Sequence, residues 1–357
     1  MKWEFGDIVN GEAEVDPLLG LSCFMLGFKR YDILDYVSDQ WKNGIDDPAE
    51  ILRKKLYYMS KGYDSVFQIS GALANETAIK IADDYQRRLG GDRNIIVTIE
   101  MGYHGNSFLT DAMTLGKITD LNNIYNIKRD FSNPPDWDKV SCIIFETRQW
   151  NYNMVPYPEG DNNFSPNNFW LNIEKAQENG VLIIVDDIFF GGGKTGNFFG
   201  WESLPIEPDI CTMGKAITGG YFPLSIVLIN KKFDIDHNLF EDSYFSKSGI
   251  LSCLKYIDIL ETEKYLEIEN IKSLQTRVEE IFSDGGPEDK GPIDINFGTV
   301  YVFDIDGMLQ VPFNANEEYF ERLKKWKVSL YENLNMCGWM DPNIYGALLE
   351  SKKQRNC

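Results

Sequence analysis

The stretch that decides the fold is VLIIVDDIFFGGGKTG, residues 181–196. It opens with a continuous apolar run, which is typical of a β-strand buried on both faces of a parallel sheet. The strand ends on two carboxylates, Asp186 and Asp187, and a glycine-rich turn follows. Because neighbouring strand residues point to opposite faces, only one of the two carboxylates can look into a cleft at this edge. A carboxylate buried there needs a cationic partner.

Similar apolar runs lie on both sides of this stretch. They are IIVTIE (95–100), CIIFE (142–146), DICTMGK (209–215) and PLSIVLI (223–229). Apolar residues at helical spacing lie between them, over residues 75–89 and 168–180. This alternation favours an α/β fold with a mostly parallel sheet covered by helices on both faces. In such folds, ligands bind at the carboxyl ends of the strands.

The pattern changes after about residue 249. Long amphipathic stretches follow, over 250–282 and 317–334, with one strand-like run, TVYVFDI (299–305), between them. We therefore expect residues 40–255 to form a large domain. Residues 1–39 and 256–357 would form a smaller α+β domain built from both ends of the chain.

Charge and cysteine usage exclude several classes of function. A net charge of −20 disfavours binding to nucleic acid or to an anionic membrane surface. The six cysteines are scattered without paired spacing, and only two histidines are present, so we expect reduced thiols and no metal site. The first residues lack a targeting signal, and no apolar run could span a membrane, so we expect a cytoplasmic protein.

Two further segments carry candidate chemistry. Lys215 follows an apolar strand, and a lysine desolvated at a strand end can lose its proton and attack a carbonyl group. The turn Ser70-Gly71-Ala72 opens a helix whose free N–H groups would favour a phosphate. Each feature also has a simpler interpretation, as a helix cap, a surface lysine or a loop. Their order on one sheet favours a shared site.

The segment GGGKT (191–195) is similar to a phosphate-binding P-loop but does not satisfy its pattern. A P-loop requires a glycine six residues before the lysine, and residue 188 is isoleucine. We therefore do not expect nucleotide hydrolysis.

Four segments together resemble the class III aminotransferases, which are pyridoxal 5'-phosphate (PLP) enzymes of fold type I. They are SGALANETAIK (70–80), GYHGNS (102–107), VDDIFFGGGKTGNFFGWE (185–202) and PDICTMGKAITGGYFPLS (208–225). Residues 17–40 are also similar to the family's opening strand and first helix. The resemblance extends in order from about Asp16 to Cys253 and implies that residues 40–255 are the PLP-binding domain.

The resemblance also implies roles for individual residues. Lys215 would be the Schiff-base lysine and proton shuttle, and Asp186 would pair with the pyridine nitrogen and keep the ring an electron sink. Gly71 and Ala72 would donate backbone N–H groups to the phosphate.

Three further residues belong to the implied cofactor site. The GYHG motif supplies His104 and Tyr103, whose ring would stack on the cofactor. Glu146 stands where the family has a glutamate near the phenolic side of the ring. No metal is implied.

The implied activity is transfer of an amino group from a donor amine or amino acid to a carbonyl acceptor, by an enzyme that is usually a homodimer. The same cofactor site also serves aminomutases, racemases and decarboxylases. A non-catalytic partner subunit with this fold is a further alternative.

Several positions depart from the family pattern. Phe189 replaces a glutamine that contacts the phenolic oxygen, Ala72 replaces a serine or threonine, and Leu73 replaces an acidic residue. The family's EPxxG reads ETRQW here, and the arginine-containing RLxPP-like segment near the C-terminus is missing. These departures suggest a terminal amine, an aldehyde or a group on a larger molecule, such as a peptide or protein, as substrate.

Two roles stay open at this point. Arg148, in the altered ETRQW segment, could replace a lost contact to an anionic substrate or could be structural. The partner subunit's phosphate-binding threonine has only Ser246 and Ser248 as counterparts, so this role is unassigned.

Overall fold

The computed structural model describes most of the amino-terminal three quarters of the chain. The main described ranges are 22–27, 29–44, 46–100, 102–114, 121–128, 131–148, 166–233 and 246–267. Short described stretches outside them include 8–9, 12–13, 300–303 and 307–310.

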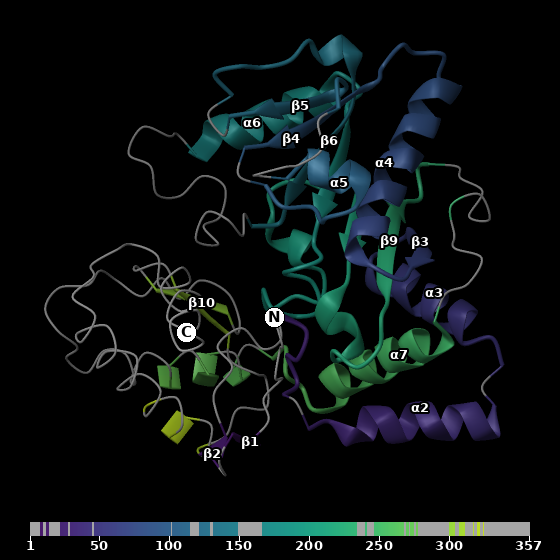
Figure 1. Ribbon diagram of the computed structural model, residues 1–357, viewed down its shortest axis with the longest axis vertical. Helices are drawn as coiled ribbons and strands as arrows, with labels where there is room; N and C mark the ends of the chain where they lie inside the picture. The colour runs from purple at the N-terminus through teal and green to yellow at the C-terminus, as the bar shows by residue number, and fades with distance from the viewer. Residues whose placement is uncertain are drawn as a thin grey trace, which may run out of the picture.

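A seven-stranded sheet forms the centre of the molecule (Figure 1). Its strands, in spatial order, are β3 (Tyr63–Gln68), β9 (Ser225–Asn230), β8 (Ile210–Met213), β7 (Leu182–Asp186), β6 (Val140–Glu146), β4 (Ile95–Ile99) and β5 (Ile124–Ile127). Strand β9 is antiparallel to both of its neighbours, and the other pairs are parallel. The carboxyl ends of β3, β4, β6, β7 and β8 therefore lie at one edge.

The expected α/β fold with a mostly parallel sheet is confirmed. The apolar runs over 95–100, 142–146, 181–187, 209–215 and 223–229 form β4, β6, β7, β8 and β9. Strands β3 and β5 were not predicted, because polar residues such as Asp64 and Asn126 interrupt their apolar pattern.

Alternating side chains of the central strands build two separate cores. On β6, Cys142 and Ile144 belong to one apolar cluster, whereas Ile143 and Phe145 belong to the other. Because successive side chains of a strand point to opposite faces, these clusters mark the two faces of the sheet. A run that is apolar at every position is thus buried on both sides.

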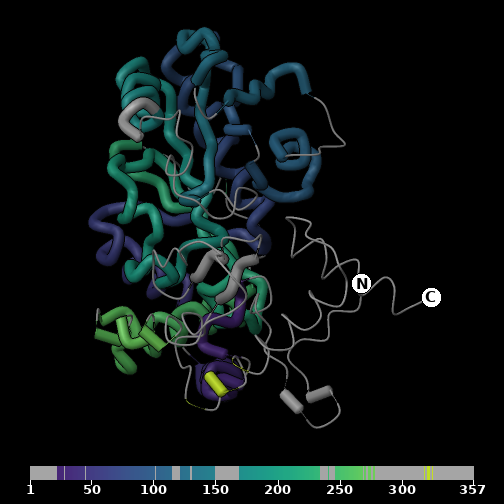
Figure 2. Tube along the Cα trace, turned by 90° about the vertical axis from the view of Figure 1, so that its left-hand side faces the viewer, coloured from purple at the N-terminus to yellow at the C-terminus, as the bar shows by residue number. Residues whose placement is uncertain are grey.

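Six helices cover these faces or pack beside them. They are α2 (Tyr31–Asn43), α3 (Pro48–Met59), α4 (Gly71–Arg88), α5 (Phe108–Ala112), α6 (Pro166–Glu178) and α7 (Lys247–Thr262). Helix α4 packs in one core, and α2, α3, α6 and α7 contribute to the other. Helices α2 and α7 lie toward one end of the sheet, and β4 and β5 lie toward the opposite end (Figures 1 and 2).

The helix starts follow from local sequence. The Ser70 side chain accepts a hydrogen bond from Leu73 N at the start of α4, and Asp47 does the same for Glu50 N at the start of α3. Pro48 occupies the first turn of α3, where a missing N–H has no cost. The helices expected over 75–89 and 168–180 are confirmed as α4 and α6, and a helix within 17–40 is confirmed as α2. Residues 22–27, where the family's opening strand was expected in part, contain turns.

The smaller domain remains a prediction. The strand-like run from residue 299 is β10 (Val300–Phe303), which pairs with β11 (Gly307–Gln310), and β1 (Ile8–Val9) pairs with β2 (Glu12–Ala13). In the amphipathic stretch from residue 250, α7 ends at Thr262, and helical residues follow at 269–270, 272–274 and 276–277. Most of 278–357 lies outside the described residues. Helices α2 and α7 span the boundaries expected at 39/40 and 255/256.

Four of the six cysteines lie within the described ranges. Cys142, Cys211 and Cys253 are buried free thiols, and Cys23 is a partly buried one. None of the helices in the described ranges is long and apolar enough to cross a bilayer. Within those ranges, too, no cluster of His, Cys, Asp and Glu could hold a metal ion.

Replacing Ile144 in the middle of β6 tests the two-sided core. Its side chain is 0% exposed, so Ile144→Ala should lower the free energy of unfolding by about 2–5 kcal/mol. Urea unfolding should show a lower midpoint with an unchanged slope. Leu171→Ala on α6, where the leucine is 48% exposed, is the control and should cost far less. Equal costs would contradict the assignment of this core.

Candidate active site

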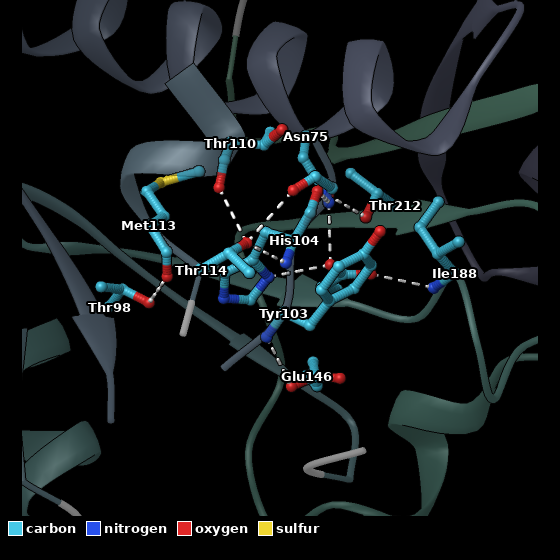
Figure 3. Close-up of polar contacts among 12 residues, drawn as sticks. Asn75, Thr98, Tyr103, His104, Thr110, Met113, Thr114, Glu146, Ile188 and Thr212 are labelled. Carbon is cyan, nitrogen blue, oxygen red and sulfur yellow. Dashed lines mark hydrogen bonds and ion pairs between the residues drawn. The ribbon is translucent and has the colours of Figure 1, made fainter. Parts of the chain in front are cut away.

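The centre of the candidate site is the carboxylate of Asp186, at the end of β7. It is only 4% exposed, and its residue pairs with Glu146 on β6 and Thr212 on β8. Its Oδ2 atom accepts hydrogen bonds from Asn75 Nδ2 (2.8 Å) and His104 Nδ1 (2.9 Å), and its Oδ1 atom accepts one from Ile188 N (3.1 Å). These contacts fix the position of the carboxylate and leave Oδ1 with capacity for another donor (Figure 3).

The ring of His104 supports this carboxylate through a hydrogen bond. Its Nδ1 atom must carry the proton to donate to Asp186, while Nε2 is buried and has no partner among the described residues. Gly102 leaves the space that Nε2 occupies, because a Cβ atom at that position would lie 3.2 Å from it. His104 therefore orients the Asp186 carboxylate through its Nδ1 atom.

Asn75, on the buried side of α4, joins three elements of the site. It donates to Asp186 and to the backbone oxygen of His104 (2.9 Å), and its Oδ1 atom accepts from Thr212 Oγ1 (2.7 Å). In Figure 3, Asn75 lies beside both His104 and Thr212. Sequence reasoning missed this residue, although an asparagine on the apolar face of a helix was a signal for a buried polar contact.

Asp187 points away from this centre, as expected from the alternation of strand side chains. Its carboxylate accepts hydrogen bonds from Thr147 Oγ1 (2.5 Å) and Gly200 N (2.7 Å). Burial raises the pKa of Asp187 to about 7, against the lowering effect of these hydrogen bonds. A Cβ atom at residue 200 would lie 2.3 Å from Asp187 Oδ1, so only glycine fits there. Asp187 thus anchors the loop that follows β7.

Lys215 directly follows β8 and Gly214 at the same edge. Its backbone φ of 52° lies in the left-handed region, which is uncommon for a residue with a side chain and concentrates at functional sites. Its Nζ atom lies 4.1 Å from the centroid of the Phe189 ring. Burial lowers the pKa of Lys215, and the charges of Cys23, Asp186 and Glu146 oppose that shift. The charges of both carboxylates, Asp186 and Glu146, therefore act on the amine of Lys215.

Tyr103 and Glu146 form another part of the edge. The backbone N–H of Tyr103 donates to Glu146 Oε2 (3.2 Å), and the Tyr103 side chain is 42% exposed. Burial raises the pKa of the Tyr103 phenol, and the charges of Asp186 and Glu146 raise it further. The aromatic ring is therefore accessible beside both carboxylates.

The start of α4 presents unused backbone donors. Leu73 N donates to Ser70 Oγ and Ala74 N donates to Ser70 O, but the N–H groups of Gly71 and Ala72 have no acceptor in the described part of the chain. Gly105 packs closely against this turn, because a Cβ atom there would lie 2.7 Å from Ala72 Cβ. An anion is the natural ligand for such a helix start.

The remaining candidates from the sequence are two serines, one arginine and the GGGKT segment. Ser246 caps α7 through Gly249 N (3.1 Å), and Ser248 Oγ accepts from Trp41 Nε1 (2.9 Å). Arg148 is buried after β6. The GGGKT segment forms turns without a following helix, which agrees with the rejection of a P-loop.

The predicted residues Asp186, Lys215, Glu146, Tyr103 and His104 thus gather at the carboxyl edge of the sheet. The start of α4 with Gly71 and Ala72 follows β3 at the same edge. The arrangement combines a buried acceptor for a cation, an amine with a lowered pKa and free donors for an anion. It suits a compact ligand that carries an anionic group, a cationic ring atom and an electrophile.

Comparisons with known proteins agree with this picture. Residues 136–269 match the family model described as aminotransferase class-III. The chain is 33% identical over 214 residues to the adenosylmethionine-8-amino-7-oxononanoate aminotransferase of Buchnera aphidicola, covering 53% of this chain and 48% of the relative. The enzyme of that name from Anoxybacillus flavithermus is 26% identical over 311 residues, covering 72% of this chain and 66% of the relative.

The fold is shared with solved transaminases over nearly the whole chain. The structure of adenosylmethionine-8-amino-7-oxononanoate aminotransferase from Methanocaldococcus jannaschii superposes with a TM-score of 0.72 at 20% identity, covering 92% of this chain and 90% of that one. This likeness shows the fold. The chain spans about half to two thirds of the length of the curated relatives it matches.

Asn75→Ala tests whether the site depends on this buried amide. The change removes donors from Asp186 and His104 O and the acceptor of Thr212, so the free energy of unfolding should fall by about 1–3 kcal/mol. Arg87→Ala on the same helix is the matched control, since its exposed pair with Asp83 contributes little. Urea unfolding of both variants gives the comparison. A cost for Asn75→Ala no larger than that of the control would refute this role.

Proposed function

We propose that this chain, which belongs to the class III aminotransferase family, is a PLP-dependent aminotransferase. It would move an amino group from a donor amine or amino acid to a carbonyl acceptor. The observation that carries the proposal is the meeting of Asp186 and Lys215 at one sheet edge, where Asp186 is buried, Lys215 is partly buried, and the charge of Asp186 acts on Lys215.

The residues present fit PLP on three independent points. Among the described residues, Asp186 has no lysine or arginine partner and keeps capacity at Oδ1, which suits a protonated pyridine nitrogen. The N–H groups of Gly71 and Ala72 suit a phosphate. Lys215 offers an amine to an aldehyde. When bound, PLP supplies an aldehyde for amines and a ring that stabilises negative charge on the substrate carbon.

Asp186 and Lys215 would then have separate roles in the reaction. Asp186, oriented by Asn75 and His104, would hold the ring nitrogen in its protonated form. Lys215 would bind the aldehyde carbon, give way to the donor amine, and then take and return a proton at the substrate carbon through its Nζ atom.

The two remaining site residues would border the ring. Tyr103 would cover one ring face, and Glu146, held by Tyr103 N, would border the phenolic side. Both roles are those that the family resemblance implies for Tyr103, in the GYHG motif, and for Glu146, at the end of β6.

Phe189 and the altered ETRQW segment favour a substrate other than an ordinary α-amino acid. The names of relatives include acetylornithine, gamma aminobutyrate and diaminobutyrate. We infer that the donor is a small molecule with a terminal amine. A terminal amine on a peptide or protein would react in the same way and is the alternative substrate. A homodimer is expected from the family resemblance, and a cytoplasmic setting is in keeping with the free thiols.

The visible absorbance spectrum of the purified protein with added PLP tests this function. Wild-type protein should show a visible band that Lys215→Ala lacks, and a panel of glutamate, alanine, gamma aminobutyrate and diaminobutyrate should contain one donor that converts the band to a near-ultraviolet one. A colourless wild-type protein in excess PLP would contradict the enzymatic proposal and favour a non-catalytic subunit. A visible band that no amine converts would favour racemase, aminomutase or decarboxylase chemistry.

A further inference from the structure

A second lysine borders the same aromatic ring as Lys215. Lys194, on the loop that follows β7, is 0% exposed. Its Nζ atom donates to the backbone oxygen of Phe189 and lies 5.5 Å from the centroid of the Phe189 ring. Because Lys215 Nζ lies 4.1 Å from the same centroid, one aromatic ring contacts both amines.

Several titratable groups act on the two amines without contacting them. Lys194 is within the field of Lys215, Cys23 and Asp187, and Lys215 is within that of Cys23, Asp186 and Glu146. In the described part of the chain, neither amine has a carboxylate at ion-pair distance. Burial lowers the pKa of both lysines, and the charge of Lys215 helps to lower the pKa of Lys194 to about 7.

We propose that Lys194 and Lys215 share one positive charge around the Phe189 ring, and that Lys194 thereby keeps Lys215 available as a neutral amine. The inference rests on the proposed function, because it explains how Lys215 can capture an aldehyde near neutral pH. Lys194 is a positioning residue in this account and makes no contact with the reacting atoms. Two buried like charges disfavour each other, which is a known way to activate a lysine nucleophile.

The local contacts favour Lys194 as the site where the proton stays while Lys215 reacts. Lys194 has the Phe189 carbonyl as an acceptor, and Ser22 Oγ also donates to that carbonyl (3.2 Å) and fixes it. Lys215 has the ring face and, among the described residues, no hydrogen-bond acceptor. A cation–π contact alone compensates less of the cost of burying a charge than a hydrogen bond and a cation–π contact together.

The chemical step needs only the neutral amine. The nitrogen lone pair of Lys215 forms a bond to the aldehyde carbon, and both hydrogens of the amine leave with the carbonyl oxygen as water. No oxidation or reduction takes place. An ammonium group at Lys215 has no lone pair and must first release a proton, so the rate near pH 7 depends on the charge of Lys194.

The charge sharing can be measured without any cofactor by a thermal double-mutant cycle. A lysine whose pKa is lower in the folded state binds fewer protons than it does when unfolded, so its cost is greatest below about pH 7 and falls as the pH rises toward its ordinary value. Lys194→Met should therefore raise the melting temperature by several degrees at pH 6 and by less at pH 9.

The decisive comparison is the effect of Lys194→Met in wild-type protein and in Lys215→Met protein. In Lys215→Met protein the repulsion is already gone, so the gain from Lys194→Met at pH 6 should be smaller than in wild type. Equal gains in both backgrounds would overturn the proposal. The exposed Lys54→Met serves as the control and should give no difference between the two backgrounds.

The pH profile of aldehyde capture gives the second test. Wild type, Lys194→Met and Lys194→Arg are incubated with PLP from pH 6 to 10, reduced with borohydride, and the modified Lys215 peptide is quantified by mass spectrometry. Lys194→Met should shift the midpoint of the rate upward by about one pH unit, the effect of a unit charge about 10 Å away at an effective dielectric constant of about 20. Lys194→Arg keeps the charge and should keep the low midpoint.

The outcomes separate the two proposals. Identical midpoints for wild type and Lys194→Met would overturn the role of Lys194 and leave the proposed function intact. Wild-type protein that captures no PLP at Lys215 would contradict the proposed function, and the thermal cycle would still decide whether the two lysines share a charge.

Discussion

The constraint on which the rest of the site depends is the burial of one carboxylate, that of Asp186, at the end of a central strand. A buried carboxylate is stable only when fixed donors satisfy it. Here the donors come from three places: Asn75 on α4, His104 on the loop after β4, and the backbone of Ile188. Since these segments are far apart in the sequence, the carboxylate fixes the helix, the loop and the strand relative to one another.

The sheet explains why these groups meet. Parallel strands bring their carboxyl ends to one edge. Glu146 and Asp186 end β6 and β7, and Lys215 follows the adjacent strand β8, so the three residues lie at that edge. The second acidic residue, Asp187, points the other way and ties down the glycine loop through Gly200 N. That loop carries Phe189 and Lys194, so Asp187 helps to position the ring that both lysines border.

Much of this was predictable from sequence, because the signals are local. Continuous apolar runs predicted five of the seven strands, and strand alternation predicted that Asp186 and Asp187 would separate. The contacts of Asn75 and Lys194 could not be predicted in the same way. Asn75 is distant in sequence from Thr212, and Lys194 and Lys215 border the same Phe189 ring because β7 and β8 are neighbours in the folded sheet. The interplay between the two lysines is therefore a property of the tertiary structure.

The most direct measurement of the central claim is a crystal structure of the protein grown with PLP. The account predicts continuous density from Lys215 Nζ to the cofactor's aldehyde carbon, with Asp186 Oδ1 at hydrogen-bond distance from the ring nitrogen and the phosphate at the N–H groups of Gly71 and Ala72. Cofactor bound through another lysine, or a ring nitrogen that faces away from Asp186, would contradict it.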